Sequence, residues 1–413
     1  MFADNVWSLP GDINDNFSAF PRAMKIAEGT ICVIDTNCKI LKHLWSLMDI
    51  YLAVQRKKYG KSGAYKLDFY TTIVTNQLKA AVGLTDGLIE NDFNSLVKKS
   101  DREAKFPLEI IKEAFKVNVK SADYDGDKYI QRFVMNAITG IPRNDEHTKD
   151  DKKYDDFNKI LGGIFVSSSL DRLLRENPSD AELYRYLEAL NAYAPTSISL
   201  DLSNSNHHLI IRKKIVKVVF ESLPSSIERV HIHLTIDKFT STHFSSIFNL
   251  DGIFNPVKNE LFNFINKLKK LKALRIYGVD LVATEVKNML NEHHKSITSL
   301  ALVDCSITDN EMKEIMAEIQ QCLCLEELDL SENPFSVEGL RNIDDMLVNC
   351  SRTIKLRLFN KDTKKLNNFE TIKQSFKEIM PYHFSSVSNL HCLPFILQYS
   401  STNFVLLYML FIY

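Results

Sequence analysis

Apolar and polar residues in the second half of the chain follow a pattern that returns every 26 to 28 residues. Each copy begins with the short apolar–polar alternation of a half-buried strand and continues with the spacing of an amphipathic helix. The clearest strand-like segments are LKALRIYGVDL (271–281), ITSLALVDCSI (297–307), LEELDLSENPF (325–335) and TIKLRLFNK (353–361), and the fainter ones are SISLDLSNS (197–205) and IERVHIHLT (227–235). We therefore expect strands centred near residues 200, 230, 274, 300, 328 and 356.

The segments between these strands have helix periodicity. Met312, Ile315, Met316 and Ile319 lie at i, i+3, i+4 and i+7, which places them on one face of a helix. Thr308 and Glu311, at the start of this stretch, have the spacing of a capping box. Each unit is thus expected to be a strand followed by a full helix.

One unit carries the most specific motif. Leu325, Leu328, Leu330 and Asn333 fit the pattern L-x-x-L-x-L-x-x-N, and Cys305 replaces the Asn one unit earlier. The pattern resembles the leucine-rich-repeat signature, and a unit of 26 to 28 residues with a full helix is similar to the ribonuclease-inhibitor-like subclass. The resemblance implies an α/β solenoid of about six repeats over residues 195–362, a horseshoe with parallel strands on its concave face and helices on its convex face.

One interval between strands is too long for a single unit. Val230 and Leu274 are 44 residues apart. The additional residues include a Phe-rich stretch, 244–264. Such an insertion is often on the binding side of a repeat protein. Alternatively, these Phe side chains fill the core of a degenerate repeat.

No repeat is found in residues 1–190, where the apolar spacing predicts a separate α-helical domain. GTICVIDTN (29–37) is consistent with one short strand, and residues 38–54 with a helix. Further helices are expected at 68–82, 86–99, 107–117, 127–138, 155–175 and 180–193. After the repeats, residues 363–413 are expected to form a C-terminal cap helix and an apolar tail.

Composition and charge exclude several classes of protein. The chain has 51 Lys and Arg against 52 Asp and Glu, a formal charge of −1, so it lacks the basic character of a nucleic-acid-binding protein. The first residues do not have the basic and apolar regions of a signal peptide. The apolar run 404–413 has ten residues, too few to span a bilayer. We expect a fold of the reducing cytoplasm with no nucleic-acid partner. A membrane-attached scaffold is a third alternative that rests only on this apolar run.

Cys38 is the candidate for nucleophilic chemistry. It follows Asp35, Thr36 and Asn37 at a predicted helix start, and a helix N-terminus favours the thiolate. His43 lies five residues further along the same helix and points away, so the remaining base is His147, in a charged loop with nearby aspartates. No family motif surrounds Cys38, and an ordinary structural cysteine is the competing interpretation.

The sequence shows no cofactor or metal motif. His231 and His233 share a strand face, but no carboxylate or thiolate lies at a partner spacing. The seven cysteines do not repeat a CxxC spacing, and no GxxxxGK[ST] or GxGxxG segment is found. We therefore expect no metal and no cofactor.

Residues between the strand leucines are expected to face solvent in two columns, because side chains alternate along a strand. One column contains Asp201, His231, Arg275, Ala301, Asp329 and Arg357, and the other contains Ser203, His233, Tyr277, Val303, Ser331 and Phe359. Aromatic and Arg side chains are typical of protein-binding hot spots. The predicted binding residues are His231, His233, Arg275, Tyr277, Val303, Asp329, Arg357 and Phe359.

These features predict a protein that binds another protein through the concave face of its repeats. The Lys-, Asn- and Phe-rich sequence and degenerate repeats resemble bacterial effectors of the Legionella type. That resemblance implies delivery into a host cell by a specialised secretion system and a host or bacterial protein as partner. The alternative is a cysteine-dependent protease or transferase in the N-terminal domain, with the repeats recruiting its substrate.

Overall fold

The structure is a computed structural model, and it describes residues 24, 26–59, 65–75, 78–85, 95–124, 131, 134–135, 138, 151–202, 217–234, 251–336, 338–339, 342–343, 354–358, 395–398 and 405–406. The chain divides into two compact units between Pro195 and Thr196. Both units combine helices and strands, so the fold is mixed α/β.

The N-terminal unit contains a small sheet and several helices. Its elements are β1 (Gly29–Val33), α2 (Lys39–Lys42), α3 (Leu44–Tyr59), β2 (Lys66–Thr75), β3 (Leu78–Leu84), α4 (Ser95–Glu103), α5 (Leu108–Phe115), η2 (Val119–Ser121), α7 (Asp151–Ser167), α8 (Leu170–Arg175) and α9 (Asp180–Tyr193). The strand order is β1-β2-β3, with β1 parallel and β3 antiparallel to β2. The short strand expected within residues 29–37 is confirmed by β1, but the unit also contains β2 and β3, so the prediction of an α-helical domain is wrong.

The error arises in residues 68–82, where the predicted helix is in fact most of a β-hairpin. Leu67, Phe69 and Thr71 are buried in alternation, which is the period of a strand and not of a helix. The run Thr71–Thr75 consists of β-branched residues, whose restricted side chains favour strands. The sheet packs against α3 and α4.

The helices of this unit agree better with the sequence. The predictions at 107–117 and 180–193 are confirmed by α5 and α9. The Ser179 hydroxyl accepts from the Glu182 N–H, and the Glu182 carboxylate accepts from the Ser179 N–H, which closes a capping box at the start of α9. The helix α7 packs against both α5 and α9.

The C-terminal unit is built on consecutive strands. Its elements are β4 (Ser197–Asp201), β5 (Arg229–His233), α12 (Asp251–Lys267), β6 (Ala273–Tyr277), α13 (Ala283–His293), β7 (Ser299–Val303), α14 (Asp309–Gln321), β8 (Glu327–Asp329), β9 (Lys355–Leu358), β10 (Phe395–Gln398) and β11 (Val405–Leu406). The strands β4 to β9 are parallel and pair in chain order. All six predicted strand centres are confirmed.

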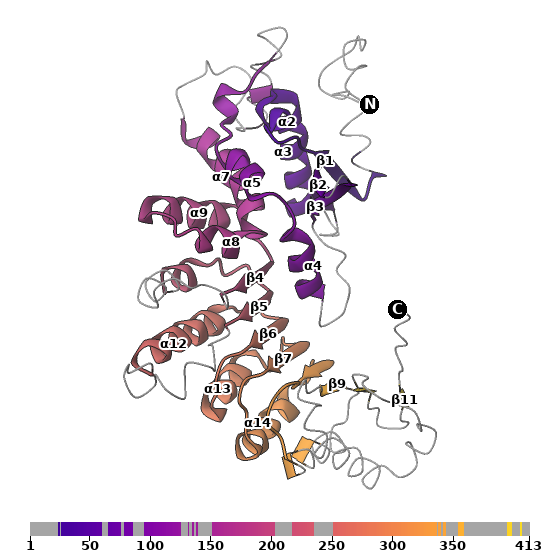
Figure 1. Ribbon diagram of the computed structural model, residues 1–413, viewed down its shortest axis with the longest axis vertical. Coiled ribbons are helices and arrows are strands. Elements are labelled where there is room, and N and C mark those ends of the chain that lie inside the picture. The colour runs from indigo at the N-terminus through magenta and orange to yellow at the C-terminus, as the bar shows by residue number, and fades with distance from the viewer. Residues whose placement is uncertain are drawn as a thin grey trace. The chain divides into compact units, whose positions relative to one another are not determined.

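Alternate residues of these strands are buried and form the core of the unit. Leu274, Ile276 and Leu328 are each at most 1% exposed. Figure 1 shows α12, α13 and α14 side by side along one face of the strands. The predicted capping box of α14 is present, with Thr308 and Glu311 bonded reciprocally. The sheet therefore has one face covered by helices and one face on which the described residues place no helix, called the open face below.

The Phe-rich stretch contributes to this core. Phe262 and Phe264, in α12, are 8% and 2% exposed, and the Phe264 ring stacks on Phe220 with centroids 5.7 Å apart. These contacts favour the core interpretation for the part of the stretch that the structure describes. Residues 244–250 lie outside it.

Asn333 joins two consecutive turns beyond the strands. Its Oδ1 accepts from the backbone N–H of Cys305 (3.0 Å) and of Ile307 (3.2 Å), and its Nδ2 donates to the carbonyls of Leu302 (2.7 Å) and Leu330 (2.9 Å). One side chain thus satisfies peptide groups that the end of a strand would otherwise leave buried without partners. Cys305 occupies the matching position after the preceding strand, and its thiol donates to the carbonyls of Val303 and Ile276.

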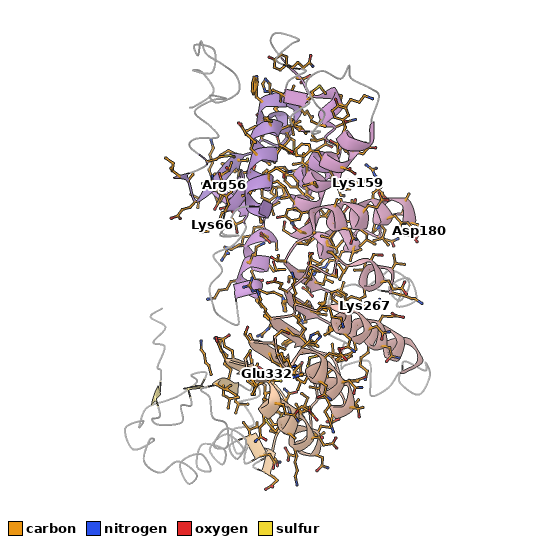
Figure 2. The ribbon with its side chains drawn as sticks, turned by 180° about the vertical axis from the view of Figure 1, so that it is seen from behind. Arg56, Lys66, Lys159, Asp180, Lys267 and Glu332 are labelled. Carbon is orange, nitrogen blue, oxygen red and sulfur yellow. The ribbon has the colours of Figure 1, made fainter. Side chains whose placement is uncertain are left out.

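The backbone repeats the same turn after three successive strands. Gly278, Asp304 and Glu332 follow β6, β7 and the β8 segment, and their φ angles are 74°, 52° and 64°. Glu332 is labelled in Figure 2. The shared left-handed conformation shows that the three turns have the same backbone geometry even though their side chains differ.

The C-terminal residues extend the sheet. β10 pairs antiparallel with β9, and β11 pairs antiparallel with β10. The predicted cap helix after residue 362 lies outside the described residues. In the part of the chain that is described, no helix is both long and apolar enough to cross a membrane.

We predict that Leu328→Ala lowers the free energy of unfolding by about 2–5 kcal/mol, because it leaves a cavity at a site with 0% exposure. The measurement is urea unfolding followed by circular dichroism. The matched control is Leu323→Ala, since Leu323 is 72% exposed and its truncation should cost no more than about 0.5 kcal/mol. Equal effects of the two substitutions would contradict the assigned core.

Candidate functional site

The open face of the parallel sheet presents three rows of side chains, each running across the strands. The first row is Ser197, Arg229, Ala273, Ser299, Glu327 and Lys355; the middle row is Ser199, His231, Arg275, Ala301, Asp329 and Arg357; the last row is Asp201, His233, Tyr277 and Val303. Neighbouring strands are about 4.8 Å apart. Residues of one row are therefore close enough to interact across strands.

The strand pairing corrects one predicted alignment. Ser199, not Asp201, lies beside His231, whereas Asp201 lies beside His233. The expected first column was displaced by two residues in β4, because the fainter copy SISLDLSNS contains two equally suitable polar positions. The remaining pairs of that column are aligned as predicted.

An ion pair spans the middle row. The Arg275 guanidinium lies 3.1 Å from the Asp329 carboxylate, and the two residues are on β6 and β8, with Ala301 of β7 between them. The small Ala301 side chain leaves room for this bridge and is itself 1% exposed. Asp329 also accepts a hydrogen bond from the Ser331 N–H at 3.1 Å. The opposite charges of Arg275 and Asp329 are thus held together in the middle of the face.

His231 is held beside this ion pair as a neutral imidazole. Its Nδ1 is 2.9 Å from the Ser199 hydroxyl, and the residue is 8% exposed. Burial, and next the nearby Arg275 charge, lower the pKa of His231 from 6.5 to about 3. At neutral pH this histidine is therefore a hydrogen-bonding group and not a charge.

The last row contains a group of partly exposed side chains that contact one another. The His233 Nδ1 lies 3.2 Å from the Asp201 carboxylate, and their side chains are 29% and 35% exposed. The Tyr277 ring meets the His233 ring edge to face, with centroids 4.5 Å apart. The sequence predicted His233 and Tyr277 but missed Asp201 as their neighbour, a relationship that only the register of β4 reveals.

Several predicted binding residues are not solvent-facing. Val303, Asp329 and His231 are 3%, 4% and 8% exposed, so the expectation that all of them lie open to solvent is wrong. Asp329 and His231 are covered because they bond to neighbours in their row, and Val303 is short and lies in register with the larger Tyr277. Arg357 is half-buried. Phe359 lies outside the described residues.

Cys38 has the environment of a structural cysteine. It is 0% exposed, and its thiol donates to the Ile110 carbonyl, with Sγ and O 3.5 Å apart. It precedes α2, a helix of only four residues, and Asp35 accepts from the backbone N–H groups of Asn37 and Lys39 there. Burial raises the pKa of the Cys38 thiol to about 11, the opposite of what a nucleophile requires.

The base proposed for Cys38, His147, lies outside the described residues. His43 is described, and its backbone forms a bridge with Asp123. Within the described ranges, no three His, Cys, Asp or Glu side chains gather as a metal site would require.

The sequence matches no protein-family model and none of the curated proteins with which it was compared. The open face is therefore interpreted from its own geometry.

We predict that His231 makes stability depend on pH. Its folded pKa of about 3 lies below the unfolded value of 6.5, so the unfolded state alone gains a proton as pH falls below 6.5. The stability present at pH 7 is then lost on acidification, by about 2 kcal/mol from this group between pH 7 and pH 5. Urea unfolding of His231→Asn, which keeps a polar partner for Ser199, should show a smaller loss over that interval. The same pH slope in both proteins would contradict the assignment.

The Cys38 thiol should resist alkylation in the folded protein. With a pKa of about 11, only about one thiol in a thousand is ionised at pH 8. Iodoacetamide labelling quantified by mass spectrometry should be at least about 100-fold slower at Cys38 than at Cys324, which is exposed. In denaturant the two rates should converge. Rapid selective labelling of Cys38 in the native protein would instead support the enzyme alternative.

Proposed function

We propose that this chain is a leucine-rich-repeat protein of the ribonuclease-inhibitor-like subclass that binds another protein through the open face of its parallel sheet. Parallel strands in chain order, intervening helices, the recurring turn and the bonds of Asn333 support this proposal. We propose as well that the repeats curve into a horseshoe. A solenoid of this kind offers an extended surface that loses little conformational entropy on binding.

The observation that carries the proposal is the arrangement of Asp201, His233 and Tyr277 on three adjacent strands. The carboxylate orients the imidazole, and the imidazole packs against the tyrosine ring. A partner would therefore meet an aromatic ring that is already positioned, which lowers the entropic cost of using it as a hot spot. The Arg275–Asp329 pair adjoins this group and gives the surface a fixed polar border.

We further propose that the partner is a host or bacterial protein and that the chain is a bacterial effector. This part of the proposal rests on the resemblance of the sequence to such effectors. The competing enzyme hypothesis has no support from the described residues, because Cys38 is buried and its pKa is raised.

Site-specific photo-crosslinking tests the binding face directly. A photoreactive phenylalanine analogue at Tyr277 should crosslink a partner from host lysate, whereas the same group at Lys313, exposed on α14, should not crosslink that protein. Products found equally at both positions would reject a specific role for the open face.

We predict that Tyr277→Ala weakens binding of the identified partner by roughly 30-fold, equivalent to about 2 kcal/mol. His233→Ala should act in the same direction, because it removes the ring that supports Tyr277. Titration calorimetry with the purified partner measures both effects, and Lys313→Ala is the matched control. Unchanged affinity in both face variants, with normal thermal unfolding, would show that the partner binds elsewhere.

A further inference from the structure

The hairpin of β2 and β3 extends beyond the core of the N-terminal unit. At its base, Phe69 and Leu84 are in register and are 0% and 3% exposed. Towards its tip, Val74 and Leu78 are 68% and 73% exposed. Figure 1 shows this sheet at the margin of the unit, and Lys66, labelled in Figure 2, begins β2. The distal part of the hairpin therefore presents large apolar side chains to solvent.

The hairpin carries almost no charge. Residues 69–84 contain one charged side chain, that of Lys79 on β3. Exposed sheet edges are ordinarily protected by charged residues, Pro or bulges, and an isolated two-stranded hairpin is only marginally stable in water. A hairpin whose distal part has one charged residue and exposes Val74 and Leu78 is expected to be covered by another strand.

One edge of β2 is open along this distal part. The register of β1 ends where Val33 meets Tyr70, and the last bond between them is donated by the Ile34 N–H to the Tyr70 carbonyl. Among the described residues, no strand continues beside β2 beyond that point. Peptide groups alternate in direction along a strand. Those of Thr72 and Val74 therefore point to the same side as those of Lys66 and Tyr70, which bond to the β1 segment.

We propose that the chain forms a homodimer in which the open β2 edges of two copies, over Thr72–Thr75, pair as antiparallel strands. A two-fold axis places each edge against an identical one. The segment is uncharged and its residues are all β-branched, so the pairing creates no repulsion and brings residues that favour strands together. Lys79 lies on β3 and would remain on the outer edges of the resulting four-stranded sheet.

The occupant is inferred from this self-complementarity. β3, the other edge of the hairpin, carries Lys79, whereas Thr72–Thr75 of β2 contain no charged residue and no described strand lies beside their open edge. The Ile73 and Val74 side chains of both copies would lie side by side on the two faces of the joined sheet, which reduces the apolar surface that Val74 exposes to water.

The test is sedimentation velocity of the full chain over about 1–100 µM. We expect a concentration-dependent species of twice the 47.4 kDa chain mass. Val74→Lys should weaken dimerisation at least tenfold by placing like charges together. Val74→Pro should do the same by removing an N–H that faces the open edge, while leaving the β2–β3 bonds intact.

The matched control is Leu323→Lys, at an equally exposed apolar residue of the C-terminal unit (72%). It should dimerise like the unmodified protein, and circular dichroism should show the native fold in all variants that are compared. A chain that is monomeric throughout the concentration range would overturn the proposal. So would a dimer that persists in both Val74 variants, or one that Leu323→Lys weakens to the same extent.

Discussion

Hydrogen bonding between successive parallel strands is the constraint on which the C-terminal unit depends. One strand with its following helix is too small to bury its own apolar side. Its backbone groups gain hydrogen-bond partners and its leucines are buried only when the next strand and helix pack beside it. The carbonyl of Thr298 illustrates the linkage, because it accepts bonds from the N–H groups of both Glu326 and Glu327 at the start of the following strand. Such shared bonds fix the register.

A fixed register determines which side chains meet on the open face. Arg275 reaches Asp329 two strands away only because Ala301 separates them. A larger residue at position 301 would occupy the space that the ion pair crosses. The polar middle row thus depends on side-chain size as much as on charge, and its members His231, Ala301 and Asp329 are buried, whereas His233 and Tyr277 of the last row are partly exposed.

The sequence was sufficient to locate the six parallel strands, because β6 to β9 recur at a period of 26 to 28 residues and β4 and β5 carry fainter copies of the same apolar alternation. It could not reveal the register of β4, where two polar positions two residues apart satisfy the same pattern. Nor could it reveal that Val303 is buried, since exposure depends on neighbouring strands as well as on alternation within one strand. The hairpin at residues 68–82 was mistaken for a helix because the apolar spacing was given more weight than the β-branched run Thr71–Thr75.

The same backbone constraint has opposite consequences in the two units. In the C-terminal unit each of the strands β5 to β9 is paired on both sides, so the backbone groups of these strands bond within the sheet and the open face consists of side chains. In the N-terminal unit β2 extends beyond the end of β1, and among the described residues no strand pairs with this edge of β2 beyond Tyr70. Side-chain surfaces can be tailored to one foreign partner, whereas backbone groups bind any compatible edge, and an identical uncharged edge is compatible by symmetry. The binding that we propose for the open face of the parallel sheet thus depends on side chains, whereas the self-association that we propose for the hairpin depends on backbone groups at the edge of β2.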